Sequence, residues 1–305
     1  MHGAPQPSQA APPRLLPGLA LAITGAITFS AKAIIVKLAY RYGADAVTML
    51  MLRMLFALPI FVLMAWWASR GKAALSLRAW LGVIGLGFCG YFLSSSLDFA
   101  GLQYVSASLE RLILYLNPTL VMLLGWLLYR KKVARLQVGG MALSYCGVVV
   151  VFGQEVQLAG GQTAIGSALI LASAVSYAVY MVYSGQLVKR LGALRLVGLA
   201  TSVACGFALL QYALLRPLGA IAAIAPEVVW LSVLNATLCT ALPVLLVMMA
   251  IERIGPALSA QSGMVGPLAT IMMGVLILGE PFTAWIAVGT VLVIAGIFEV
   301  SRAPP

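Results

Sequence analysis

Charged and chemically reactive side chains are scarce in this sequence. Only 9% of its 305 residues are Asp, Glu, Lys or Arg, whereas soluble domains average about 25%. The one histidine is His2, and there is neither a P-loop for ATP nor a His/Cys grouping at metal-ligand spacing. These absences exclude a histidine proton relay, argue against an ATP-driven pump, and lead us to expect no metal and no cofactor. The four cysteines fall in apolar segments, where we expect them to pack as small apolar side chains.

Long apolar runs make up most of what is present, since 62% of the residues are hydrophobic. A window of about 20 apolar residues is long enough to cross a bilayer as a helix, and such windows recur along the chain. The sequence therefore predicts an all-α integral membrane protein with ten transmembrane helices. We expect a disordered cytoplasmic tail over 1–14 and a short C-terminal tail over 302–305. The expected spans are 16–38, 47–69, 79–99, 104–128, 136–153, 163–187, 194–215, 228–251, 256–279 and 282–300.

Basic residues gather in every second loop. With the N-terminus inside, the cytoplasmic segments hold thirteen Lys and Arg residues and the external loops hold two, Arg41 and Arg216. Cytoplasmic loops of membrane proteins carry this excess, so both termini are expected in the cytoplasm. The net charge of +11 does not predict a nucleic-acid partner, because that reading needs a basic face on a folded surface. The expected partners are the lipid bilayer and a small-molecule solute.

The chain contains an internal repeat. Residues 15–155 and 156–301 each hold five expected spans. Several glycines and a proline of the first half recur in the second half at a constant offset of 149 positions. Because five is odd, the second half enters the membrane in the opposite direction, which predicts two inverted five-helix repeats. Secondary transporters commonly have this arrangement, with the solute site near the midplane. The recurring pairs are Pro118 with Pro267, Gly125 with Gly274, Gly140 with Gly289, and Gly147 with Gly296.

The sequence combines ten expected spans, a five-span duplication, short loops, Arg53 early in the second span and the motif LGEP at 278–281. With these features it resembles an EamA-type permease of the drug/metabolite transporter superfamily. The resemblance covers residues 15–300. It implies a multi-pass secondary transporter of the bacterial inner membrane that exports small polar metabolites such as amino acids. The first half carries Tyr-Arg-Lys at 129–131 where the second half has Leu-Gly-Glu. Small multidrug relatives place a glutamate in their first helix, where this chain has Lys32, so their antiport mechanism does not carry over.

Four charged residues are the leading candidates for the solute site. Lys32 lies about 25 Å along the first span, at 1.5 Å per residue, and Arg53, Asp98 and Glu110 are expected in the same outer depth zone. Arg111 shares this zone as a weaker candidate, and for Glu110 and Arg111 a position at the membrane interface is the alternative. A charge at this depth is expensive unless it is paired or faces water. Lys32 is therefore expected to pair with Asp98 or Glu110, or to hold a carboxylate of the solute. The alternative is that the long cationic side chains reach out to the lipid headgroups.

Other candidates follow from helical spacing and from proline. Thr28 shares a small, polar helix face with Lys32, and this face is either a cavity wall or a packing seam between helices. The dipeptides Asn117-Pro118 and Gly266-Pro267 lie at equivalent places in the repeats and in mid-span. Proline removes a backbone hydrogen bond, so these positions are expected to bend the helix as a hinge or gate; a simple packing kink is the alternative.

A polar and aromatic stripe with Tyr177 and Tyr180 follows one face of the sixth span, and Gln261 is a weaker candidate ahead of Gly266. The tyrosines either line a path or bond neighbouring helices. We therefore expect a transporter and not an enzyme, acting by alternating access. A membrane-embedded enzyme acting on lipid, or a scaffold without transport, is the competing class, although no nucleophile or acid-base pair has recognisable spacing. The oligomeric state is left open, and a monomer is compatible with the sequence.

Overall fold

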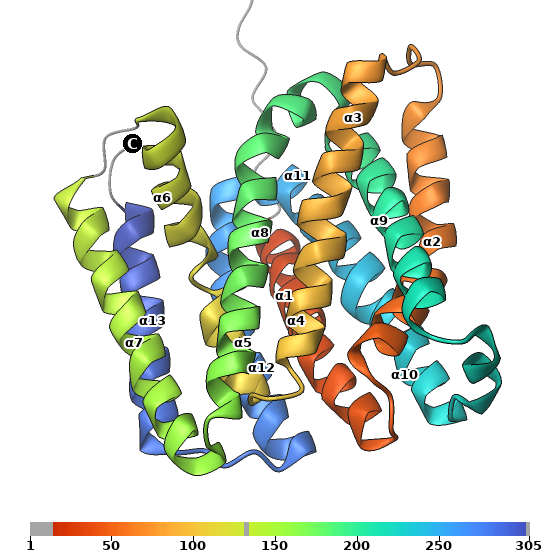
Figure 1. Ribbon diagram of the computed structural model, residues 1–305. Coiled ribbons are helices and arrows are strands. Elements are labelled where there is room, and N and C mark those ends of the chain that lie inside the picture. Colours follow the sequence, from red (N-terminus) through yellow and green to blue (C-terminus); the bar gives the residue numbers. More distant parts are fainter. Residues whose placement is uncertain (1–14, 131–133, 303–305) are drawn as a thin grey trace, which may run out of the picture.

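The computed structural model describes residues 15–130 and 134–302. The predicted N-terminal tail and the last three residues lie outside this range. Throughout it the chain is helical, without a strand, and the helices stand side by side (Figure 1). The α-helices are α1 (Leu15–Arg41), α2 (Ala46–Ser69), α3 (Leu77–Leu86), α4 (Ser94–Gly101), α5 (Ala107–Leu114), α6 (Asn117–Tyr129), α7 (Arg135–Ala159), α8 (Gln162–Leu191), α9 (Ala193–Leu215), α10 (Pro226–Ala236), α11 (Leu242–Ser262), α12 (Gly266–Met273) and α13 (Ala284–Arg302).

Eight helical stretches in the described ranges are long and apolar enough to cross a membrane. Two further apolar helices, Gly263–Leu278 and Ala284–Val300, are shorter. The predicted all-helical membrane class is therefore confirmed. One predicted boundary is wrong: the break expected near 252–255 falls inside α11, which continues to Ser262, and the helix changes to a 3-10 turn at Gly263–Val265 instead.

Five short segments of 3-10 or π-helix connect or interrupt the α-helices. A π-helical turn inserts an extra residue and often marks a functional position. The π segments are η1 (Gly87–Leu93), η3 (Thr237–Ala241) and η5 (Gly274–Leu278), and the 3-10 segments are η2 (Leu218–Ala223) and η4 (Gly263–Val265). Of the three π segments, η1 and η3 each join two α-helices into one longer stretch, and η5 extends α12 to its C-cap residue, Gly279.

The two repeated prolines begin helices and do not bend them from within. Pro118 occupies the first turn of α6, and Pro267 occupies the first turn of α12. Our expectation that Pro118 and Pro267 bend a helix in its middle is therefore wrong. At the start of a helix proline loses no hydrogen bond, because the first backbone N–H groups have no partner within the helix. The interruptions precede the prolines, at 115–116 and at 263–265.

The last helices of the two halves, α7 and α13, pack along each other (Figure 1). Their repeated glycines meet in a crossed pattern. A Cβ atom on Gly147 would lie 2.6 Å from the carbonyl oxygen of Gly289, and Gly140 stands equally close to the backbone of Gly296. The residue numbers of both pairs add to 436, so the two helices run antiparallel. Glycine is needed here because the two backbones touch.

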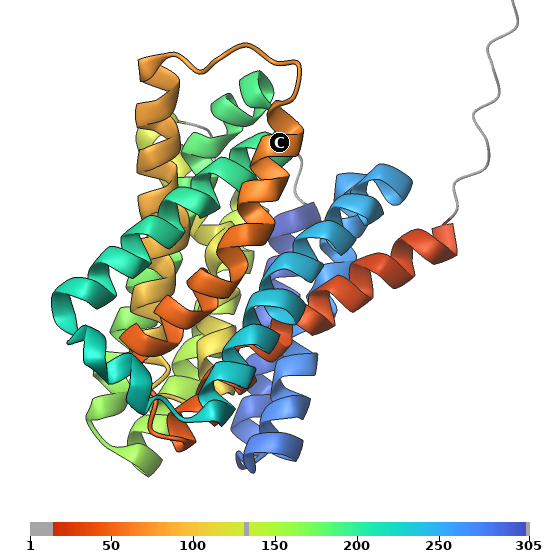
Figure 2. The same ribbon diagram turned by 90° about the vertical axis from the view of Figure 1, so that its right-hand side faces the viewer.

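Helix α1 is central and runs obliquely across its neighbours (Figure 2). It packs along α11 of the second half, again through glycine: added Cβ atoms would contact Ile254 at Gly18 and Val247 at Gly25. Both residue pairs add to 272, so α1 and α11 are antiparallel as well. This pairing places the middle of α1 where both halves of the chain can reach it.

Candidate functional site

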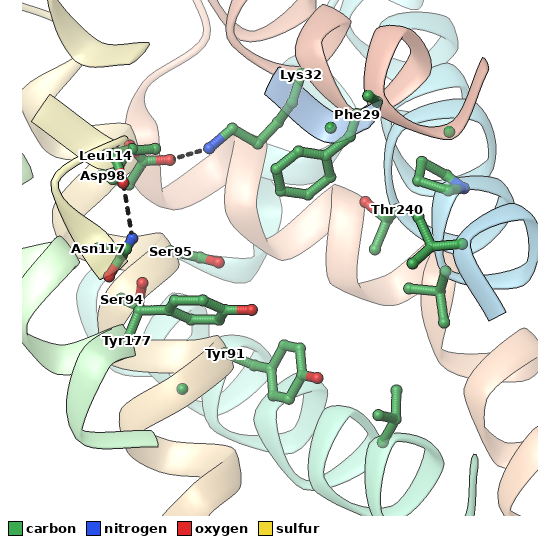
Figure 3. Close-up of a pocket in the computed structure, with 18 of the residues that line it drawn as sticks. Phe29, Lys32, Tyr91, Ser94, Ser95, Asp98, Leu114, Asn117, Tyr177 and Thr240 are labelled. Carbon is green, nitrogen blue, oxygen red and sulfur yellow. Dashed lines mark hydrogen bonds and ion pairs between the residues drawn. The ribbon is translucent and has the colours of Figure 1, made fainter. Parts of the chain in front are cut away.

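A cavity of about 590 Å³ lies beside α1 and is bounded by α2, α4, α5, α6, α8 and α11 (Figure 3). Cavities of roughly 300–1,000 Å³ hold small molecules in proteins. Along α1 the lining runs from Lys32 back to Ala22, and ten residues of helix correspond to about 15 Å. The adjoining wall is formed by apolar residues of α11, namely Pro243, Val244, Val247, Met248 and Ile251.

Lys32 and two carboxylates form the charged cluster at one end of this cavity. The Lys32 ammonium contacts Asp98 Oδ2 (Figure 3) and lies 3.2 Å from Glu110 Oε1. The three residues are 6%, 3% and 0% exposed. Lys32 and Asp98 line the cavity, whereas Glu110 lies behind them. Lys32 therefore does not reach out to the headgroups, and both of the carboxylates considered as its partner contact it.

Arg53 enters the cavity from α2. Its Nε donates to the Thr240 hydroxyl at 3.0 Å, and Nη1 donates to Ser95 Oγ at 3.4 Å. Its guanidinium also lies 5.3 Å from the centre of the Phe99 ring. Thr240 belongs to the π segment η3, so the irregular helix in the second half supplies a partner for a cation in the first. Like Lys32, Arg53 is buried by protein and not extended toward lipid.

Arg111 lines the cavity, although the sequence makes it only a weaker candidate. A position at the membrane interface was the alternative, but α5 is buried, and Arg111 is only 5% exposed. Nη2 donates to Ser30 Oγ at 2.8 Å, and the guanidinium lies 5.1 Å and 5.5 Å from the ring centres of Phe29 and Tyr115. Its position directly after the buried Glu110 is the signal in the sequence that points to it.

The structure distributes the remaining candidates between the cavity and its surroundings. Asn117 and Tyr177 line the cavity. Tyr180 lies just outside it, with its hydroxyl 3.1 Å from that of the lining residue Tyr91. The Thr28 hydroxyl bonds to the backbone of its own helix, at Thr24 O, and is not part of the lining.

The other candidates near the helix interruptions belong to the second half. The side chain of Gln261 lies outside the described residues. Gly266 is not a lining residue, but its carbonyl accepts a hydrogen bond from Ser30 at 2.9 Å. An added Cβ atom there would lie 2.6 Å from Tyr115 Oη and 3.1 Å from Arg111 Nη2. Because Gly266 has no side chain, Tyr115 and Arg111 can occupy the space beside it.

Beyond Lys32, the C-terminal end of α1 is tied to its neighbours by polar contacts, and we call this region the tied end. Lys37 Nζ donates to the carbonyl of Val105 at 2.6 Å and lies 3.6 Å from Glu280 Oε1. The same carboxylate accepts from the backbone N–H of Ala107 at 2.8 Å and from Ser108 Oγ at 3.1 Å. Glu280, in the loop of the LGEP motif, thus caps α5 of the first half.

Two more residues of α1 complete the tied end. The Tyr40 hydroxyl donates to the carbonyl of Phe99 at 2.6 Å, and the Arg41 guanidinium donates to the carbonyl of Leu278. The tied end therefore joins α1 to α4 and to the segment before α13. It closes the bundle on the side of Lys32 that faces away from the cavity.

Comparisons with known proteins agree with this architecture. The EamA-like transporter family matches the chain twice, over residues 16–153 and 164–302. The uncharacterized transporter YcbK of Bacillus subtilis (strain 168) is 32% identical over 279 residues, which is 86% of each chain. The uncharacterized transporter YetK of the same organism is 26% identical over 252 residues, or 81% of this chain and 76% of YetK.

A solved structure described only as "Crystal structure of protein" shares the fold, with a TM-score of 0.60 at 19% identity over 92% of this chain and 95% of the other. The two family matches together span nearly all of the described helices. They confirm the resemblance found in the sequence, and the chain belongs to the EamA-like transporter family of multi-pass membrane proteins.

Proposed function

We propose that this protein is a secondary transporter of the bacterial inner membrane that exports a small polar solute, such as an amino acid, by alternating access between two inverted repeats. The observation that carries the proposal is the cavity at the junction of the halves, with buried charges at one end. Such charges are expensive inside a membrane protein and usually mark a solute or ion path. A scaffold has no need of them.

The crossed glycine contacts support the inversion of the repeats. Gly140 corresponds to Gly289 and Gly147 to Gly296 by sequence, yet each contacts the counterpart of the other. Such reciprocal contact is what a two-fold axis produces. Because the equivalent helices α7 and α13 are antiparallel, an axis in the membrane plane relates them, as in inverted-topology transporters.

The unequal ends of α1 support alternating access. The cavity extends from Lys32 toward the N-terminal end of α1, whereas the tied end blocks the other direction. If the loop charges set the orientation as expected, the N-terminus is cytoplasmic and the cavity faces the cytoplasm. Release to the outside then requires the contacts of Lys37, Tyr40 and Arg41 to separate.

The charge balance supports a solute that carries a negative group. Three cations and two carboxylates meet in or against the cavity, and three minus two leaves one positive charge in excess. An amino acid or another carboxylate would balance this excess. The apolar wall on α11 would then contact the uncharged part of such a solute.

Flux into proteoliposomes tests the proposal. Purified protein is reconstituted, and uptake of a panel of labelled amino acids and simple carboxylates is compared with that of protein-free vesicles and of vesicles holding the Lys32→Met variant. We expect saturable uptake of at least one panel member by the parent protein alone. Equal uptake in all three preparations across the panel would contradict the transport proposal.

The orientation has a separate test. With the native cysteines replaced, a single cysteine is introduced by Lys132→Cys in the loop expected to be cytoplasmic, and by Gly43→Cys in the turn expected outside. A membrane-impermeant thiol reagent added to intact cells should label the second position and not the first. The reverse pattern would place the cavity on the outer side of the membrane.

A further inference from the structure

We infer that Arg111, and not Lys32, is the residue that binds the negative group of the solute. This group carries one negative charge and has the size of a carboxylate. This inference deepens the proposed function and rests on it, because it assigns a role within the same cavity. The argument depends on which of the three cations has already found its counter-charge within the protein.

Lys32 is already occupied by two carboxylates. Asp98 and Glu110 both contact its ammonium, and Glu110 is wholly buried. A solute carboxylate would have to displace one of them and leave that charge buried without a partner, which is strongly unfavourable. Lys32 therefore stabilises the two acidic residues and is poorly placed to bind a third.

Neutral groups accept some of the hydrogen bonds that Arg53 can donate. Two of its nitrogens donate to the hydroxyls of Thr240 and Ser95. These contacts fix the guanidinium against Phe99 and link α2 to η3 and α4. Arg53 adds positive potential to the cavity, but much of its hydrogen-bonding capacity is used by the fold itself.

Arg111 is the cation with the least compensation. No carboxylate lies within 4 Å of it among the described residues, and its buried Nε has no hydrogen-bond partner in the same set. A buried, unpartnered donor on a cation is costly, and a guanidinium presents its N–H groups in a fork that fits a carboxylate. The rings of Phe29 and Tyr115 hold its position.

Two further polar atoms of the cavity lining also lack partners in the described part of the chain. Asn117 Oδ1 and Ser259 Oγ are buried without hydrogen-bond partners among these residues, and both residues line the same cavity as Arg111. The lining therefore offers the Arg111 guanidinium to a carboxylate, and the Ser259 hydroxyl and the Asn117 carbonyl oxygen to other polar groups of the solute. The size of the charge follows from the excess of one positive charge, which a monoanion neutralises and a dianion would reverse.

The first test measures the local potential without any solute. In a protein whose native cysteines are replaced, Leu114→Cys places a thiol one helical turn from Arg111, where residues three apart are neighbours. Val244→Cys places a matched thiol on the apolar wall. The rates of modification by anionic sulfonatoethyl methanethiosulfonate and by cationic trimethylammonioethyl methanethiosulfonate are then compared, with and without Arg111→Gln.

We expect Arg111→Gln to lower the anion-to-cation rate ratio at position 114 at least about tenfold, because a unit charge a few ångströms away acts on the two reagents in opposite directions. At position 244 the ratio should fall much less. Arg111→Lys keeps the charge and should keep most of the ratio at position 114, which separates the loss of charge from a folding defect. An unchanged ratio at position 114 in Arg111→Gln overturns the inference.

The second test uses benzoate as the probe, with its neutral counterpart benzamide as the control. Benzoate should slow modification at position 114 more than benzamide does at equal concentration, and Arg111→Gln should abolish the difference. Arg111→Lys should retain only part of it, because the planar fork is lost. Protection no greater than that by benzamide, or protection that survives Arg111→Gln, overturns the assignment. Both tests are independent of flux, so binding through Arg111 without transport would refute the proposed function alone.

Discussion

The two ends of α1 are built from different interactions. At the tied end, Lys37, Tyr40 and Arg41 reach across to other segments through hydrogen bonds and an ion pair. At the cavity end, Gly18 and Gly25 let α1 approach α11 closely, and no side-chain hydrogen bond joins these two helices among the described residues. A hydrogen bond is lost over a short displacement because it depends on distance and angle, whereas packed helices can slide past each other by small amounts.

Under the proposed alternating access, this difference makes the tied end the gate and the packed cavity end of α1 the pivot. The charged cluster of Lys32, Asp98 and Glu110 lies between the two ends and uses the same helices, α1 and α5, that the tied end joins. A change in the cluster therefore acts on both Lys37 and the start of α5. The predictions below disturb the cluster first, then the packing around Arg111, and last the tied end and an ion pair near it.

The largest effect is expected from Lys32→Met. The variant keeps the length of the side chain but leaves Asp98 and Glu110 buried together without their shared cation. Removing one partner of a buried ion pair costs about 3–5 kcal/mol, so the melting temperature should fall by many degrees and transport should be lost. A variant with normal flux and stability would show that the cluster does not hold the middle of α1.

A compensated variant separates stability from transport. Adding Asp98→Asn and Glu110→Gln to Lys32→Met removes the stranded charges, so thermal stability should recover by most of the loss. Flux should remain absent, because the charged cluster that links the two ends is gone. Recovery of flux together with stability would reduce the cluster to a structural role.

The sequence predicted the fold class correctly but did not predict every helix boundary. Apolar length is a local property, and it gave the helical membrane class, whereas the orientation and depth read from the loop charges stay predictions. Apolar length could not place the break at Gly263–Val265, because a glycine tolerates both a continuous helix and an interruption, and tertiary contacts decide between them. Pro118 and Pro267 marked the right places but the wrong geometry, because the pattern alone does not show on which side of a proline the helix ends.

The sequence gives the position of each candidate residue along its helix but not the direction in which its side chain points. Helical rise gives the height of Lys32 or Asp98 along a span, while the rotation of each helix about its axis depends on packing. For this reason the sequence left Asp98 and Glu110 as alternatives although the structure uses both. Arg111 was ranked low because a charge near the start of a span usually faces the interface, and Glu280 was not a candidate because a carboxylate in a loop usually faces water.

The second largest effect is expected from Gly266→Ala. The new methyl group would approach Tyr115 Oη at 2.6 Å and Arg111 Nη2 at 3.1 Å. Overpacking of this kind costs about 1–3 kcal/mol, and the cost falls on the contacts of α12 with α1 and α5. Thermal unfolding should show that loss, and Gly206→Ala, at a position with nothing within 4 Å of the added atom, is the matched control. Equal melting temperatures for the two variants would show that Arg111 and Tyr115 are free to move away.

A moderate effect is expected from Glu280→Gln at the tied end. The amide can still accept from Ala107, but it loses the attraction to Lys37 and to the positive end of α5. A loss of about 1 kcal/mol shifts an equilibrium by about fivefold, so the tied end should separate more often. A thiol introduced by Val105→Cys, buried at this end, should then react several-fold faster with a small thiol reagent. An unchanged rate would mean that the contacts of Tyr40 and Arg41 suffice to hold the gate.

The smallest effect is expected from Arg216→Gln, which tests whether any charge near this end of α1 would serve. Arg216 contacts Asp45 Oδ2 at 2.7 Å, and the two side chains are 43% and 36% exposed. Exposed ion pairs contribute only about 0–1 kcal/mol, and this one joins the turn after α1 to the end of α9 without touching α5. The reactivity of the thiol at position 105 and the rate of transport should therefore match those of the parent protein. If Arg216→Gln raised that reactivity as much as Glu280→Gln does, the gate would depend on the general charge of this surface, and the specific contact of Glu280 with α5 and Lys37 would lose its role.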